Sequence, residues 1–259
     1  MRYLIGGMLT LVLAGGTCLY LGTARADEPA RASASDAHGL VLGSAQEAQP
    51  ETMTDFLTGV TKDVDAYWTK VFADNGLPEP RVTYQWIPAG QSAASACTDA
   101  SGTSGDDIAA YCSADDTISI SEAFASRIYD GELDHSLPGS SQGYGGTAGD
   151  FAVAYIVAHE YGHQIQDELG LFEQYGSQLP TSAFELQADC YAGTWAKSAY
   201  DENRLEDGDV QEALDAALAV GDFDASNPGH HGTPEERKAA WSTGFEAGEP
   251  QACNSYLQP

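Results

Sequence analysis

Five consecutive residues, His159-Glu160-Tyr161-Gly162-His163, carry side chains that together could do chemistry. The two histidines are four positions apart, so on a helix they lie on one face, one turn apart, and both imidazoles can reach one metal ion. Glu160 follows the first histidine and can reach a water molecule at that metal. Two nitrogen ligands and a carboxylate base on one helical turn are typical of zinc sites that hydrolyse peptide bonds, so we expect Zn²⁺ as the cofactor.

The segment that must hold these side chains is strongly apolar. Residues 151–158 (Phe-Ala-Val-Ala-Tyr-Ile-Val-Ala) are apolar nearly all round, which is typical of a central, buried helix. We predict that this helix runs from Asp150 to about Leu169. A buried helix suits a metal site because ligands on a fraying helix would not keep their geometry.

A second predicted helix, from a cap at Thr181 or Ser182 to about Tyr200, offers the missing ligand. Catalytic zinc sites use three protein ligands and leave the fourth position to water. Glu185 lies 22 residues after His163, which is far enough for one helix to end and the next to pack back across the site. We predict Glu185 as the third ligand. Asp189, one turn further on, is expected to accept a hydrogen bond from the far ring nitrogen of a ligand histidine, preferably His159.

The remaining elements predict an α+β fold, with a small N-terminal sheet and a mostly helical C-terminal part. The expected helices and strands are a helix from a capping box at Thr52 to about Asp74, strands at 81–87 and 117–121, a short helix at 121–129, a helix at 206–220, and a last helix that Thr233 caps and that ends near 245–247. A Gly- and Ser-rich loop at 131–149 precedes the first metal-binding helix. It is either one rim of a substrate cleft or a plain connector.

The N-terminal residues resemble a signal peptide. A short basic start at Arg2 precedes the apolar stretch 3–21, and Ala24-Arg25-Ala26 is a small-x-small cleavage site. We predict a signal peptide at 1–26, a flexible linker at 27–51 and one metallopeptidase domain at 52–259. Cleavage would give a secreted protein, whereas an uncleaved segment would anchor it in the membrane, facing outward.

Of the five cysteines, Cys18 falls in the signal peptide and four remain. An even number in an exported chain favours two disulfides, although three pairings are open. We prefer Cys97–Cys112, which closes a short loop, and Cys190–Cys253, which ties the C-terminal tail to the second metal-binding helix. Cys190 as a zinc ligand is the alternative to Glu185.

The net charge of −28 bears on partners. So acidic a chain repels nucleic acid and anionic membrane surfaces, so we expect neither as a partner. The expected partner is a peptide or protein substrate. A stable membrane partner is expected only if the N-terminal segment stays uncleaved.

The sequence resembles a known family, the putative neutral zinc metallopeptidases of bacteria, which are broadly gluzincin-like. The resembling stretches are 149–166, 185–195 and the tail from His231 to Phe245. The resemblance implies a zincin-like fold, a catalytic Glu160, and zinc ligands at His159, His163 and Glu185. The chain departs from the family at Gln164, where members often carry a histidine, and at Ala183-Phe184, where a basic residue is common. Both positions bear on substrate preference.

Together these features predict a secreted zinc endopeptidase. Glu160 is expected to take a proton from the attacking water and to deliver it to the leaving amine. The negative oxygen of the tetrahedral intermediate needs a further donor, for which we prefer His231 over His230 and Tyr191. The alternatives are a non-catalytic exported zinc-binding protein and a zinc hydrolase that acts on cell-wall peptides.

Overall fold

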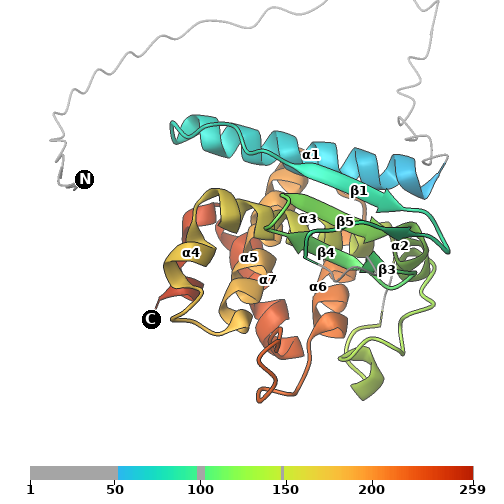
Figure 1. Ribbon diagram of the computed structural model, residues 1–259. Helices are drawn as coiled ribbons and strands as arrows, with labels where there is room; N and C mark the ends of the chain where they lie inside the picture. The colour runs from blue at the N-terminus through green and yellow to red at the C-terminus, as the bar shows by residue number, and fades with distance from the viewer. Residues whose placement is uncertain (1–51, 98–102, 147–148, 259) are drawn as a thin grey trace, which may run out of the picture. The chain divides into compact units, whose positions relative to one another are not determined.

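A computed structural model of the protein describes residues 52–97, 103–146 and 149–258, beginning with helix α1 (Met53–Asp74) (Figure 1). The Thr52 side chain accepts a hydrogen bond from the backbone N–H of Asp55, so the helix starts where the sequence predicts. One face of α1 is buried through residues at helical spacing, which are Leu57, Thr61, Val64, Trp68 and Phe72. The predicted signal peptide and linker lie outside the described residues.

A three-stranded sheet lies beside α1 in the order β1-β5-β4 (Figure 1). Strands β1 (Thr83–Ile87) and β5 (Thr117–Ser121) run parallel, and β4 (Ala109–Cys112) pairs antiparallel with β5. A separate two-stranded pair joins β2 (Ser92–Ala93) to β3 (Thr103–Ser104). The indole N–H of Trp86 donates to the hydroxyl of Thr58 at 2.9 Å and so links the sheet to α1.

The remaining regular elements of the described chain are helices. They are α2 (Glu122–Tyr129), the 3₁₀ turn η1 (Ser140–Gln142), α3 (Asp150–Glu168), α4 (Leu171–Tyr175), α5 (Thr181–Asp201), α6 (Asp209–Val220), α7 (Pro234–Ala247) and the 3₁₀ segment η2 (Pro250–Leu257). Helix α3 is central, because α1, α2, α4, α5, α6 and the sheet all pack against it. This explains why its sequence is apolar on every face. No described helix has both the length and the apolar character needed to cross a membrane.

The structure differs from the sequence predictions at several elements, and strands β2 and β3 and helix α4 were not predicted. Strand β4 was not predicted, because four residues with two alanines give too little alternation to stand out from the preceding polar loop. Helix α5 has Pro180 at its N-cap with no capping side chain, and the Thr181 hydroxyl donates to the Pro228 carbonyl instead. Helix α6 begins at Asp209 rather than Glu206. Thr233 caps α7 as predicted, and with Glu236 it also forms a capping box.

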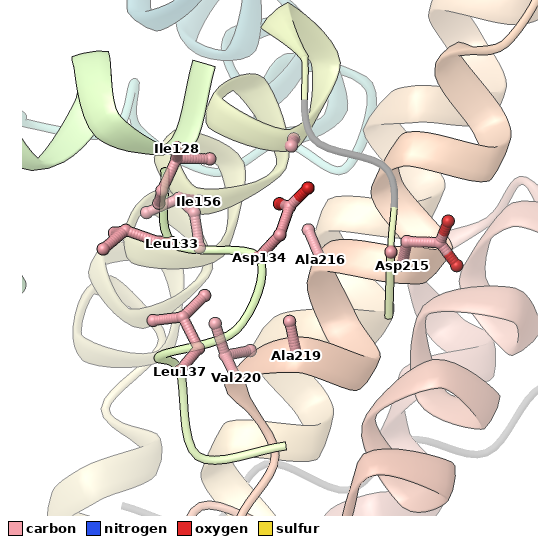
Figure 2. A pocket seen from close by; sticks show the side chains of 11 residues that line it. Ile128, Leu133, Asp134, Leu137, Ile156, Asp215, Ala216, Ala219 and Val220 are labelled. Atoms are coloured by element: carbon pink, nitrogen blue, oxygen red, sulfur yellow. The ribbon is translucent and has the colours of Figure 1, made fainter. Parts of the chain in front are cut away.

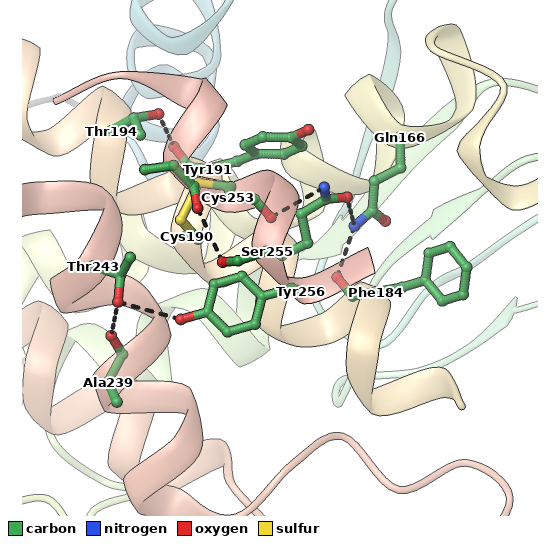
Figure 3. The surroundings of a disulfide bond; sticks show 12 residues. Gln166, Phe184, Cys190, Tyr191, Thr194, Ala239, Thr243, Cys253, Ser255 and Tyr256 are labelled. Atoms are coloured by element: carbon green, nitrogen blue, oxygen red, sulfur yellow. Dashed lines mark hydrogen bonds between the residues drawn. A yellow bond between two sulfur atoms is a disulfide. The ribbon is translucent and has the colours of Figure 1, made fainter. Parts of the chain in front are cut away.

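Helices α5 and α7 approach each other unusually closely. A Cβ on Gly244 of α7 would lie 1.9 Å from the carbonyl oxygen of Cys190, and one on Gly193 of α5 would lie 2.1 Å from that of Trp241. Only glycine fits at such contacts. The Cys190–Cys253 disulfide attaches η2 to α5 (Figure 3).

The loop before α3 is packed rather than free. Leu133 is buried, and the Gly139 N–H donates to the Ala219 carbonyl of α6 at 2.8 Å. A cavity of about 20 Å³ remains between this loop, α2, α3 and α6 (Figure 2). That volume holds about one water molecule, and its lining is largely apolar, so we regard it as a packing gap rather than a ligand site.

Candidate metal centre

Helices α3 and α5 bring the two histidines and Glu185 into one cluster. The Nε2 atom of His159 lies 3.3 Å from Oε2 of Glu185, and Nε2 of His163 lies 3.4 Å from Oε1. One donor atom from each residue falls within 4.8 Å of the others. His159 and Glu185 are buried, so the donors point inward at each other rather than into bulk water.

The far nitrogen of His159 is fixed by Asp189. Its Nδ1 lies 2.8 Å from Oδ1 of Asp189, which is fully buried. Burial alone would raise the pKa of Asp189, but Arg237 and His159 outweigh it and lower the pKa, so the carboxylate is ionised and can only accept. The Nδ1 atom therefore keeps its proton, and when a metal displaces the proton on Nε2, the Nε2 lone pair faces the cluster. Asp189 thus contacts His159, the histidine for which the sequence analysis preferred it.

Two further residues hold Asp189, and sequence reasoning missed both. Arg237 of α7 donates from Nε to Oδ2 at 2.8 Å and from Nη2 to Oδ1 at 2.9 Å, and the Tyr155 hydroxyl donates to Oδ1 at 2.6 Å. Nη2 of Arg237 is also 3.2 Å from Nδ1 and 3.3 Å from Nε2 of His159. The guanidinium therefore contacts the His159 ring as well as the Asp189 carboxylate.

The local sequence carried a signal for only one of these two residues. Tyr155 stands one turn before His159 on the same helix, and that spacing places the two on one face. Arg237 is 48 residues beyond Asp189, on a helix whose packing no local pattern predicts. Gln166 was missed as well. Its Oε1 lies 2.8 Å from Nδ1 of His163, and the spacing of three residues on α3 could have indicated it.

Glu160 borders the same cavity as the cluster. Its carboxylate forms no hydrogen bond or ion pair with another residue in the part of the chain that the structure describes, so it is available to accept a proton. The cavity measures about 370 Å³, within the range of small-molecule and peptide side-chain sites. Its lining includes residues from β4, α2, α3, α5 and α7, namely Asp107, Ala109, Ala110, Tyr111, Phe124, Pro138, Ile156, His159, Glu160, His163, Glu185, Val220, His231 and Arg237.

The three residues considered as oxyanion donors differ in whether they border the cavity. His231 lines the cavity, its side chain is 53 % exposed, and its backbone N–H donates to Asp222. His230 bonds to the other oxygen of Asp222 and is not among the lining residues. Tyr191 is in the core, edge-to-face with Trp68 at 5.0 Å, and lines a different cavity, so it is misplaced for this role. Pro138, from the loop before α3, supplies part of the rim.

The electrostatics of the cluster favour a cation. Burial alone would lower the pKa of His159, but Asp189 raises it to about 9; His163 is likewise raised, by Glu185 against the effect of burial. Burial would raise the pKa of Glu185, yet His163 and His159 hold it well below its usual range. The site therefore gathers positive charge as protons, which a metal ion would replace.

The chemical types of the donor atoms also suit zinc. Two imidazole nitrogens with fixed tautomers and one carboxylate are a known ligand set of catalytic zinc. All three ligand residues line the cavity, which could hold a water molecule or a substrate beside them. Cys190 is not available as a ligand, because it is bonded to Cys253. The second disulfide joins Cys97 to Cys112, so the structure has the two pairs that the sequence favoured.

Comparison with known proteins also points to a zinc site. The family model described as "Putative neutral zinc metallopeptidase" matches residues 5–256. An uncharacterised Escherichia coli protein, YpfJ, is 36 % identical over 165 residues, covering 56 % of this chain and 53 % of its own. Uncharacterised proteins of Mycobacterium bovis and Mycobacterium tuberculosis are 37 % identical over 137 residues, covering 44 % of this chain and 47 % of theirs.

The chain thus spans about half the length of the curated relatives that it matches. No solved structure matches it significantly. The family match extends over nearly the whole chain and includes the helices that carry the histidines, Glu160 and Glu185. The chain therefore belongs to the putative neutral zinc metallopeptidases.

Proposed function

We propose that this protein is an exported zinc metallopeptidase that hydrolyses peptide bonds, with His159, His163 and Glu185 as zinc ligands. The observation that carries the proposal is the convergence of two ring nitrogens and one carboxylate on a cavity that Glu160 also borders. Family membership supports the same reaction class. The two disulfides support an oxidising location outside the cytoplasm.

When bound, zinc supplies a Lewis acid that polarises the substrate carbonyl and acidifies a water molecule. Glu160 accepts a proton as the water oxygen attacks the carbonyl carbon. The same carboxyl group then gives the proton to the amide nitrogen as the carbon–nitrogen bond breaks, so that an acid and an amine are released. The carboxylate is suited to this shuttle because no described neighbour bonds to it.

His231 is the group we assign to the developing oxyanion. It borders the cavity from the turn before α7, and half of its side chain is accessible to a substrate. Asp222 anchors the backbone N–H of His231 at 2.8 Å and lies 3.4 Å from its Nδ1. Because the ring is exposed, it can turn toward a substrate and donate an N–H to the oxyanion.

The test uses purified full-length protein loaded with zinc, and the variant Glu160→Gln. We expect the variant to keep wild-type zinc content while casein hydrolysis falls by about 10²–10⁴-fold, the usual contribution of a general base. Glu173→Gln, the same chemical change on an exposed residue of α4, is the matched control and should stay active.

Undiminished hydrolysis by Glu160→Gln would reject the mechanism. A wild-type protein that binds zinc and cleaves neither casein nor a peptide library would be a zinc-binding protein without this activity.

A further inference from the structure

Two buried glutamines connect His163 to the C-terminal segment. Gln166 of α3 faces His163 through Oε1 at 2.8 Å, and its Nε2 donates to the Phe184 carbonyl at 2.7 Å and to Oε1 of Gln187 at 3.1 Å. Gln187 of α5 in turn donates from Nε2 to the Cys253 carbonyl at 3.4 Å. Both amides are buried, and Figure 3 shows the chain of bonds ending beside the Cys190–Cys253 disulfide.

Backbone carbonyls fix the direction of every bond in this chain. The Cys253 carbonyl can only accept, so Gln187 must turn its NH₂ group to it and its oxygen to Gln166. The Phe184 carbonyl imposes the same choice on Gln166, whose oxygen must then face His163. Nδ1 of His163 is therefore the donor, and Nε2, the atom that would bind the metal, faces Glu185 at 3.4 Å.

This arrangement does for the second histidine what Asp189 does for the first, but with neutral groups. An amide acceptor holds the ring and its tautomer without adding charge to a cluster that already contains Glu185. Burial makes the arrangement rigid, because turning either amide would leave buried donors and acceptors without partners.

We propose that Gln166 and Gln187 are positioning residues. Together they form a relay that holds the metal-binding orientation of His163 and makes zinc affinity depend on the disulfide-tied segment η2. This inference rests on the proposed metal site and adds two supporting residues to it. Helix α5 carries Glu185, Gln187 and Cys190 within two turns, so the ligand, the relay and the crosslink share one rigid element.

The chain offers a matched pair of variants for the first step. Gln164 and Gln166 both lie on α3 and both are fully buried, but Gln164 donates to the Arg81 carbonyl, away from the cluster. Gln166→Met and Gln164→Met make the same change in shape and polarity. Zinc dissociation constants are measured by competition with a chromophoric chelator, and melting temperatures are measured with the metal removed.

We expect Gln166→Met to weaken zinc binding by about 10–100-fold, the usual cost of losing a partner of a ligand histidine. Gln164→Met should bind zinc like the wild type, even though both variants melt earlier without metal. Equal zinc affinity in the two variants would overturn the positioning role. A wild-type protein that binds no zinc would overturn the proposed function and the relay together.

The second step is tested by removing each crosslink in turn. Cys190→Ala with Cys253→Ala should weaken zinc binding, because the carbonyl that orients Gln187 is no longer held in place. Cys97→Ala with Cys112→Ala is the control, since that disulfide ties a loop to β4 and does not contact the relay. Wild-type zinc affinity in the first pair would overturn the dependence on η2, and so would an equal loss in both pairs.

Discussion

Arg237 is the residue whose removal should reveal most about how this site is held. Its guanidinium is buried, makes two hydrogen bonds to Asp189 and lies against the ring of His159. Arg237→Met keeps an unbranched side chain along the same path and removes the charge. Asp189 would then be a buried carboxylate that keeps His159 as a charged partner and loses its arginine.

The cost can be worked from these contacts. Breaking a buried ion pair by removing one partner costs about 3–5 kcal/mol. Asp189 keeps the hydrogen bonds from Tyr155 and His159, so we expect the lower figure, about 3 kcal/mol. For a domain of this size, that loss lowers the melting temperature by about 6–12 °C.

The assay is urea unfolding followed by tryptophan fluorescence, with a chelator present so that metal binding does not contribute. Asp189→Asn and the double variant complete a cycle with Arg237→Met. The double variant should be more stable than the sum of the single losses predicts, by about 2 kcal/mol, because each single change leaves the other partner unpaired. Lys70→Met removes an exposed ion pair with Asp74 and should cost less than about 0.5 kcal/mol.

Additive losses in the cycle would refute this reasoning, since they would mean that Arg237 and Asp189 act independently. A loss for Arg237→Met as small as that for Lys70→Met would also refute it. Either result would show that the buried guanidinium does not hold Asp189 in its charged, histidine-binding form.

Two further substitutions and two pH-dependent effects are expected. Gly244→Ala should lower both the melting temperature and zinc affinity, because a Cβ placed 1.9 Å from the Cys190 carbonyl forces α7 away from α5; calorimetry and chelator competition measure the two effects. Tyr155→Phe should cost about 2 kcal/mol in urea unfolding, because it removes a hydroxyl that donates to the charged Asp189 and accepts from Arg237. Zinc binding at pH 7 should release protons, because the pKa of His159 is raised to about 9; titration calorimetry in two buffers of different ionisation enthalpy measures the number. For the same reason the metal-free protein should keep the stabilisation from His159 below about pH 6.5 and lose it as the pH rises through 9, which urea unfolding over that range measures.

The convergence of His159, His163 and Glu185 was predictable because each part depends on local periodicity. Spacing of four on α3 fixes the two histidines relative to each other, and the same spacing on α5 fixes Glu185 relative to Asp189. The apolar run before the histidines identified α3 as the central helix. The capping residues at Thr52 and Thr233 located two helix starts for the same reason, since a cap acts within one turn.

The residues that sequence reasoning missed depend on contacts between distant segments. Arg237 reaches Asp189 only because glycines let α7 lie almost against α5. Gln187 acquires its role only because the disulfide brings the Cys253 carbonyl to α5. Tyr191, an alternative to His231 in the sequence analysis, shows how position along a helix decides whether a side chain reaches the site. It lies on the same helix as Glu185 but six residues on, which turns it about 120° from the site and into the core beside Trp68.

The charges around the cluster explain why these distant contacts matter. Glu160, Glu185 and Asp189 contribute three negative charges, and Arg237 contributes one positive charge, so with neutral histidines the site carries a net −2. A divalent cation balances that charge, and without metal protons on the histidines compensate for it, in keeping with their raised pKa. Replacing Arg237 by a neutral residue leaves −3 around the same space. The excess charge should increase attraction for a cation while Asp189 loses its support, so Arg237→Met should change zinc affinity less than it changes stability. If zinc affinity instead fell in proportion to stability, the orientation of His159 rather than the charge of the site would dominate binding.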